Sequence, residues 1–407
     1  MLIMARFRNR FGTEPDTSAG ALPGDRVIGA NWQTSIGAAG QCGQIVGLYL
    51  NGYISDKIGY KKTMFGALIV MIAMIFIPFF AQNIETFVAG AVLQGLPWGV
   101  FQTLTTTYAS EVAPVKIRAY LTTYVNLCWV IGQLIAAGVL KGFLNGTTEW
   151  AYRIPFAIQW VWPPLILIGC FFAPESPWWL VRKGRLEDAE KAILRLTSRN
   201  SGVDFNVHEQ VMMMKATNEL EIAINAGTNY WDCFKGADLR RTEIASVAWL
   251  AQAWCGAALI GYAVQVYQRA GLDDSDAFSL NIGQSAMGAV GTMLSWWLMQ
   301  YAGRRSIYLY GLLTMTVILL IIGGLGCAGD ANTGASWGIG SLLMVYTFVY
   351  DLTVGPVCYC LVAEIPSTRL KIKTVVLARK FSLFLFPRFF SLFPQPSLLS
   401  PLFLYSL

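Results

Sequence analysis

The stretch Gly52-Tyr53-Ile54-Ser55-Asp56-Lys57-Ile58-Gly59-Tyr60-Lys61-Lys62-Thr63 is a short charged segment that separates two long apolar runs. The runs cover residues 31–54 and 63–81. Each is long enough to cross a bilayer as a helix, because ~20 residues with a rise of ~1.5 Å each span a hydrocarbon core of ~30 Å. Only about eight residues connect the runs, so they are predicted to be antiparallel neighbouring helices joined on one membrane face.

Apolar runs of this length recur along the chain. Hydrophobic residues make up 55% of the sequence and charged residues 13%, which excludes an ordinary soluble domain. The predicted spans cover residues 27–54, 63–81, 84–108, 119–142, 154–173, 243–268, 278–301, 306–327 and 337–362. The sequence therefore predicts an all-α, polytopic membrane protein.

Basic side chains divide the loops into two sets. Lysine and arginine gather in alternate loops, as Lys57, Lys61, Lys62, Lys116, Arg118, Arg182, Lys183, Arg185, Arg304, Arg305, Arg369, Lys371 and Lys373. Because cytoplasmic loops of membrane proteins carry this excess of positive charge, these loops are predicted to face the cytoplasm. The net charge of +6 belongs to that face and does not indicate a nucleic-acid partner.

Side chains that could carry out chemical steps are sparse. The chain has one histidine, His208, and its eight cysteines fall mostly inside apolar runs without zinc-ligand spacing. It has no phosphate-cradling glycine loop and no paired nucleophile and base. We therefore expect no metal, no cofactor and no enzyme activity.

The two parts of the chain resemble each other. Each carries a glycine followed by basic residues and, further on, a glutamate seven residues before a basic residue. In the first part these features are Gly59 to Lys62, followed by Glu111 and Arg118. In the second part they are Gly303 to Arg305, followed by Glu364 and Lys371. Their common order predicts parallel repeats of one helical unit.

The segment Pro174-Glu175-Ser176-Pro177-Trp178-Trp179-Leu180 resembles the PESPxWL sequence that follows the sixth helix of sugar porters in the major facilitator superfamily. The segment 52–63 resembles the loop between that superfamily's second and third helices. Residues 97–103 further resemble fungal maltose and α-glucoside permeases. The resemblance implies two six-helix halves and a monomeric secondary transporter of the plasma membrane. It implies alternating access for a maltose-type α-glucoside or a hexose, with proton symport in intact relatives.

On this resemblance, the family's first helix and last two helices are absent. A missing first helix would also explain why Arg6, Arg8 and Arg10 precede the first span on the non-cytoplasmic side. The predicted segments are an extracellular segment 1–26, a first transmembrane half 27–173 (family helices 2–6), a cytoplasmic loop with short helices 174–242, a second half 243–380 (family helices 7–10 and the start of 11), and an aberrant Phe/Leu/Pro-rich tail 381–407.

A sugar needs neutral hydrogen-bonding side chains and flat apolar faces inside the membrane. The resemblance points to Asn126, Gln133, Gln252, Tyr262 and Tyr359 as substrate-binding residues. The alternative is that the three amides only bond between helices. A second set of amides is interpreted as packing residues, namely Gln33, Gln44, Gln94 and Gln284.

The resemblance also implies a cytoplasmic gating network of charged residues that pair and separate as the halves rock. Its predicted members are Asp56, Lys61, Glu111, Arg118, Glu175, Arg304, Glu364 and Lys371. The alternative is that each is a solvated loop charge that only obeys the positive-inside rule.

Proton coupling requires a carboxylate inside the membrane. Proton-coupled relatives carry acids on the absent first helix and where Ala91 stands here, so this chain is expected not to concentrate sugar. Asp351 is the one buried carboxylate candidate of the second half. Two rival interpretations are a non-functional truncated fragment and a transporter-like sugar sensor that binds sugar without moving it.

Overall fold

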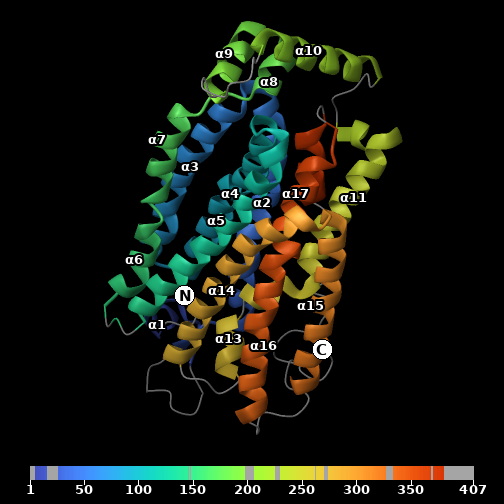
Figure 1. Cartoon of the computed structure of the whole chain (residues 1–407). Coiled ribbons are helices and arrows are strands. Elements are labelled where there is room, and N and C mark those ends of the chain that lie inside the picture. Colours follow the sequence, from blue (N-terminus) through green and yellow to red (C-terminus); the bar gives the residue numbers. More distant parts are fainter. Residues whose placement is uncertain are drawn as a thin grey trace.

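The computed structural model describes residues 5–379, apart from 16–25, 145, 147, 198–205, 225–229, 262, 270–273, 327–332 and 368–369. The described part is almost entirely helical, and its one small sheet pairs β1 (Glu14–Pro15) with β2 (Arg26–Val27). The helices run roughly side by side in an elongated bundle with short helices across one end (Figure 1). This architecture confirms the predicted all-α fold class.

The first half begins with a short helix, α1 (Ala5–Phe11), beside the small sheet. The long helices that follow are α2 (Ala30–Ile58), α3 (Tyr60–Phe80), α4 (Ile84–Val112), α5 (Val115–Gly142) and the consecutive pair α6 (Trp150–Ile158) and α7 (Trp162–Phe172). Gly59, with φ of 96°, is the only residue between α2 and α3. This left-handed conformation suits glycine and makes the predicted turn between the first two long helices.

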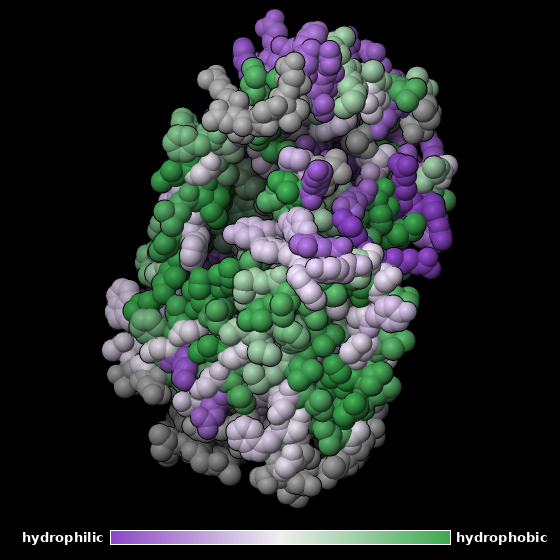
Figure 2. All heavy atoms as spheres, viewed as in Figure 1, coloured by the Kyte–Doolittle hydropathy of each residue, from purple (hydrophilic) through white to green (hydrophobic). Residues whose placement is uncertain are grey.

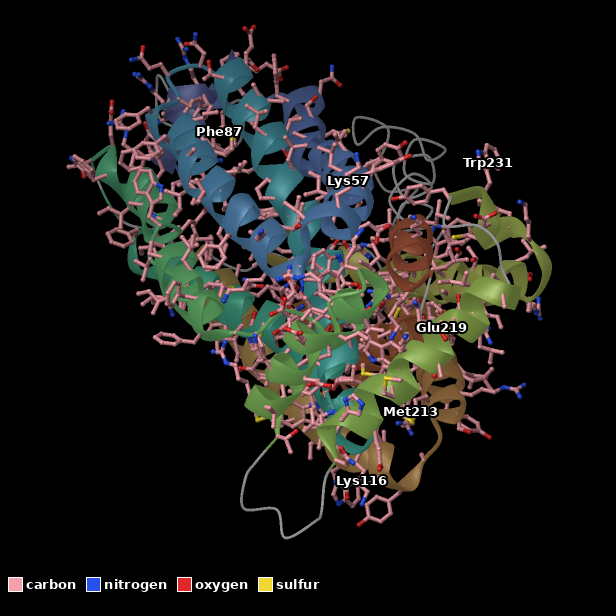
Figure 3. The ribbon with its side chains drawn as sticks, turned by 90° about the horizontal axis from the view of Figure 1, so that it is seen from above. Lys57, Phe87, Lys116, Met213, Glu219 and Trp231 are labelled. Carbon is pink, nitrogen blue, oxygen red and sulfur yellow. The ribbon has the colours of Figure 1, made fainter. Side chains whose placement is uncertain are left out.

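The connection between the halves forms the short helices α8 (Pro177–Arg182), α9 (Leu186–Leu196) and α10 (Val207–Ile224), followed by a 3-10 turn at Tyr230–Phe234. Ser176 caps α8 by accepting a hydrogen bond from the amide of Trp179. Ala189, Ala192 and Ile193 form the buried face of α9. Viewed along the bundle, α10 lies across its end with Met213 and Glu219, while Trp231 points outward (Figure 3).

The second half is formed by α11 (Gly236–Gln252), a π-helical turn at Ala253–Ala257, α12 (Ala258–Gly261), α13 (Ala263–Arg269), α14 (Asp274–Tyr301), α15 (Arg304–Gly326), α16 (Thr333–Leu352) and α17 (Val354–Glu364). Residues 371–379 form one more helix. The backbone kinks at Gly256, where φ is 95°. The hydroxyl of Tyr346 donates to the carbonyl of Cys255 beside this kink.

In the described part of the chain, six helices or helix pairs are long and apolar enough to cross a membrane. They cover Tyr60–Phe80, Ile84–Val112, Lys116–Gly142, Trp150–Phe172, Arg304–Gly326 and Trp337–Glu364. The other three predicted spans coincide with α2, α14 and the kinked series α11 to α13, which do not meet both conditions of length and apolarity. Hydrophilic side chains gather over α9 and α10, whereas hydrophobic side chains cover much of the bundle below (Figure 2).

Glycines allow α2 and α4 to pack backbone against backbone. A Cβ at Gly47 would lie 2.0 Å from the carbonyl oxygen of Leu96, and one at Gly99 would lie 2.4 Å from that of Gln44. Small residues at such contacts let membrane helices approach closely. The contact holds α2 along α4 for much of its length, although α2 is only moderately apolar.

The two halves meet mainly along α5, which packs against α14 and α17 (Figure 1). The indole nitrogen of Trp296 on α14 donates to the hydroxyl of Thr123 on α5 over 2.9 Å. Gly355 on α17 lies close to Asn126 on α5, because an added Cβ would be 3.2 Å from its amide oxygen. This seam brings polar side chains of both halves together.

Candidate functional site

A cavity of about 420 Å³ lies between the halves at this seam. Four of the five predicted substrate-binding residues line it: Asn126 and Gln133 from α5, Gln252 from α11 and Tyr359 from α17. Their helices come from both repeats, so residues far apart in the sequence share one space. The fifth predicted residue, Tyr262, lies outside the described residues.

Asn126 is buried, and its amide nitrogen donates two hydrogen bonds. It donates to Oδ1 of Asp351 over 2.9 Å and to Oγ1 of Thr292 over 3.2 Å. Thr292 donates its own hydroxyl hydrogen to the carbonyl of Gly288. The amide of the first half therefore holds a buried carboxylate and a hydroxyl of the second half.

The other predicted residues have different surroundings. Gln252 is buried, and its amide nitrogen donates to the carbonyl of Gly355 over 3.3 Å. Tyr359 is buried and packs edge-on against Trp249, with ring centroids 5.1 Å apart. Gln133 has an exposed side chain in the cavity wall. The cavity therefore offers both amide groups and an aromatic face.

The cavity wall also contains residues that the sequence analysis did not select. Gln102 accepts a hydrogen bond from Nε of Arg379 over 3.0 Å, and the guanidinium of Arg379 lies 4.4 Å from the ring centroid of Trp249. The further lining residues include Gln41, Gln44, Trp98 and Trp129. Gln44 was interpreted as a packing residue, but it lines the cavity. Trp98 and Gln102 are four residues apart on α4 and therefore share one helix face. This spacing was the feature of the sequence that could have indicated that both line the cavity.

A second cluster lies at the end of the bundle that carries α8. Glu111, at the end of α4, is buried and forms an ion pair of 3.1 Å with Arg182. Its carboxylate also accepts hydrogen bonds from the hydroxyls of Tyr60 and Ser176. Glu111 raises the pKa of Arg182 although burial of the guanidinium opposes this. Arg182, absent from the predicted network, is thus its principal partner.

Glu175 binds the turn between α2 and α3. Its carboxylate accepts hydrogen bonds from the backbone amides of Tyr60 and Lys61, over 3.0 and 3.2 Å. A Cβ at Gly59 would lie 2.5 Å from this carboxylate, so glycine is also required for the close approach. Burial raises the pKa of Glu175, and the amide hydrogen bonds, including one from Ser176, only partly oppose it.

Some of the remaining network residues join the two halves, and others bond within one half. Asp56 pairs with Lys373 over 3.0 Å, and Lys371 donates to Ser110 over 3.1 Å. The pair Arg304 and Glu364, 3.7 Å apart, stays within the second half. The ammonium of Lys61 is instead bonded to the carbonyl of Phe171. The guanidinium of Arg118 is close enough to Lys371 to influence it electrostatically, and neither forms an ion pair with a carboxylate in the described part of the chain.

The repeat predicted from the sequence is visible in these contacts. Tyr60 directly follows the turn glycine of the first half and contacts Glu111. Arg304 directly follows the corresponding Gly303 and pairs with Glu364. Corresponding positions therefore join a helix start to a helix end in both halves. In the described part of the chain, no group of three or more His, Cys, Asp and Glu side chains could hold a metal ion.

This arrangement of helices is that of the major facilitator superfamily of membrane transporters. The structure of the proton:xylose symporter XylE bound to 6-bromo-6-deoxy-D-glucose superimposes with a TM-score of 0.79 at 20% identity, covering 93% of this chain and 84% of that one. A partially occluded, inward-open structure of XylE from E. coli gives 0.71 at 18% identity, with 95% and 87% covered.

The family model "Sugar (and other) transporter" matches residues 1–386, and the chain belongs to this family. It is 43% identical over 377 residues to maltose permease MAL31 of Saccharomyces cerevisiae, covering 92% of this chain and 60% of the permease. It is 41% identical over 378 residues to the alpha-glucosides permease MPH3 of that species, covering 92% and 62%. The chain thus spans about 60% of the length of these curated relatives.

Proposed function

We propose that the chain binds a sugar, a maltose-type α-glucoside or a hexose, in the cavity between its halves and moves it across the plasma membrane by alternating access. The observation that carries the proposal is the convergence of Gln133, Gln252 and Tyr359 from three helices on one cavity. Its volume of about 420 Å³ lies in the range of ~300–1,000 Å³ that is usual for small-molecule sites.

The chemistry of the cavity supports a polyhydroxylated ligand. Amide groups both donate and accept hydrogen bonds, as sugar hydroxyls do, and neutral groups avoid the cost of burying unpaired charge. The aromatic lining, including Trp98 and Trp129, provides flat apolar surface for the ring faces of a sugar. The names of the yeast relatives support an α-glucoside over other sugars.

The two contacts between the halves near α8 support alternating access. Asp56–Lys373 and Ser110–Lys371 must separate if the halves rock apart at that end. The basic residues gathered there support a cytoplasmic position for α8, α9 and α10. We propose that the protein acts as a monomer, because each half of the cavity wall comes from the same chain.

The proposal is tested by maltose binding to the purified chain and by maltose uptake in cells that lack their own maltose transporters. Replacing Gln252 by Ala should weaken maltose binding by about 1–3 kcal/mol, since a sugar hydroxyl loses its partner. Gln33→Ala is the matched control, because this amide on α2 bonds to the carbonyl of Ile28 and does not line the cavity.

The outcomes separate the rival functions. Uptake and binding that both weaken in the Gln252 variant support a transporter. Binding without uptake would indicate a sugar sensor. A chain that folds but neither binds nor moves maltose or glucose would contradict the proposal and favour a non-functional fragment.

A further inference from the structure

Asp351 stands out among the cavity residues, because it is a buried carboxylate that neither the family network nor the predicted binding set includes. It is 4% exposed and lies at the end of α16, facing α5 and α14. A Cβ at Gly288 on α14 would lie 2.4 Å from Oδ2 of Asp351, so glycine leaves the space that the carboxylate occupies. Asp351 also lines the cavity, where it is accessible to a ligand.

Among the described residues, the side chain that donates a hydrogen bond to Asp351 is that of Asn126. The nearby hydroxyl of Thr292 is directed to the carbonyl of Gly288, and no lysine or arginine of the described part forms an ion pair with Asp351. A buried carboxylate that lost its one donor while ionised would incur a large desolvation cost, and such a group takes up a proton instead.

The amide of Asn126 has no spare hydrogen in this arrangement. One amide hydrogen is donated to Asp351 and the other to Thr292, so only the amide oxygen remains to meet a ligand. A sugar hydroxyl that accepts a hydrogen bond from Asn126 must therefore displace one of these partners. Displacing Asp351 is favourable only when its carboxylate is neutral.

We propose that sugar and Asp351 compete for the amide of Asn126, so that sugar binding is coupled to the uptake of one proton by Asp351. The inference rests on the proposed function, since it assigns a coupling role within the same site. The proton comes from hydronium in the bulk solvent, which is left as a water molecule, and it forms an O–H bond on the carboxylate. The neutral carboxyl then donates to the amide oxygen of Asn126, which turns the amide nitrogen toward the sugar.

Among the residues around the cavity, Asp351 is the group whose charge changes near neutral pH. The other ionisable residues that share the cavity wall with Asp351 are Tyr350, Tyr359 and Arg379. Tyrosine and arginine ordinarily titrate at ~10 and above ~12, so they keep their charge near neutral pH. On α5, Asn126 bonds to Asp351, and its second partner on α14 is Thr292; neither side chain titrates.

Coupling of this kind is reciprocal. If sugar favours the protonated carboxyl, then protonation favours sugar by the same factor. Sugar affinity should therefore fall as pH rises, by at most about tenfold per pH unit for one coupled proton. Asp351→Asn is always neutral and should bind sugar with an affinity independent of pH.

The test uses the full chain in lipid nanodiscs and maltose as the probe. Maltose binding is measured by calorimetry from pH 5 to 8 while proton uptake is followed in weak buffer with an indicator dye. The wild type should take up protons on binding, and Asp351→Asn should not. Asp188→Asn, at a half-exposed acid on α9 outside the cavity wall, is the control and should behave as the wild type. Proton uptake that persists in Asp351→Asn would overturn the inference.

A second measurement needs no sugar and separates this inference from the proposed function. Infrared spectroscopy reports the protonated carboxyl of Asp351 as a band that is lost in Asp351→Asn. Replacing Asn126 by Ala removes the donor, so at pH 7 this band should be stronger than in the wild type. An unchanged band would show that Asn126 does not control the carboxyl, whether or not maltose binds. A stronger band without maltose binding would uphold the control of Asp351 by Asn126 and refute only the assignment of the sugar.

Discussion

Nζ of Lys373 lies 3.0 Å from Oδ2 of Asp56, and this ion pair joins the last described helix to the end of α2. The two residues come from opposite halves of the chain. Lys373 is largely buried, whereas the side chain of Asp56 is 43% exposed, so solvent screens part of the attraction. The pair is thus suited to forming and breaking as the halves move.

Replacing Asp56 by Asn should favour separation of the halves at this end of the bundle. We expect a change of about 0.5–1 kcal/mol, the range for a partly exposed ion pair. Spin-label distance measurements between α2 and the 371–379 helix should show a larger separated population. Asp188→Asn removes an exposed pair with Arg185 close to α9 and should leave the distances unchanged. A matching shift in both variants would argue against a latch at Asp56.

Replacing Glu111 by Gln should strongly destabilise the protein, because Arg182 would keep a mostly buried charge without its counter-ion. Breaking one side of such a buried pair typically costs about 3–5 kcal/mol. Thermal unfolding in detergent should show a markedly lower midpoint. Glu111→Gln combined with Arg182→Met should recover part of the loss. No recovery would mean that the hydrogen bonds to Tyr60 and Ser176 matter more than the ion pair.

The stability of the wild type should fall as pH rises through the acid range because of Glu175. Burial raises the pKa of this carboxyl in the fold above its value in the unfolded chain. Its contribution is therefore fully present below the unfolded pKa and is lost as pH passes the raised value. Glu175→Gln stays neutral and should not show this part of the loss. The check is the difference between the two unfolding midpoints from pH 4 to 7, which would stay constant if Glu175 did not titrate in this window.

Replacing Gly47 by Ala should separate α2 from α4. The added methyl group would lie 2.0 Å from a backbone oxygen of α4, which cannot move aside as a side chain would. We expect a loss of about 3 kcal/mol or more, at the upper end for overpacking. Gly66→Ala is the control, because nothing lies within 4 Å of its added Cβ. Equal unfolding midpoints for both variants would contradict this account of the helix contact.

The sequence was sufficient for the placement of the helices and for much of the cavity. Hydrophobic length is a local property, so the runs at residues 63–81 and 84–108 closely matched α3 and α4. Because a polar amide inside an apolar helix is costly without a partner, every such amide was a candidate, and the resemblance to sugar porters selected Gln133 and Gln252 among them. Apolarity alone could not show that glycines let α2 pack backbone against backbone on α4.

By itself the sequence determined the all-α membrane fold, the turn at Gly59 and the internal repeat, and its resemblance to sugar porters pointed to Asn126, Gln133 and Gln252, three of the six amides in the cavity wall. The fold, the turn and the repeat follow from composition and spacing along the chain. Only the tertiary structure decided the partners: Arg182 for Glu111, Lys373 for Asp56, and Asp351 for Asn126. Partner choice depends on which helix faces meet in the folded bundle, and residues far apart in the sequence carry no mark of that meeting. The same packing brings Asn126 and Asp351 to a single cavity wall and makes their shared hydrogen bond possible.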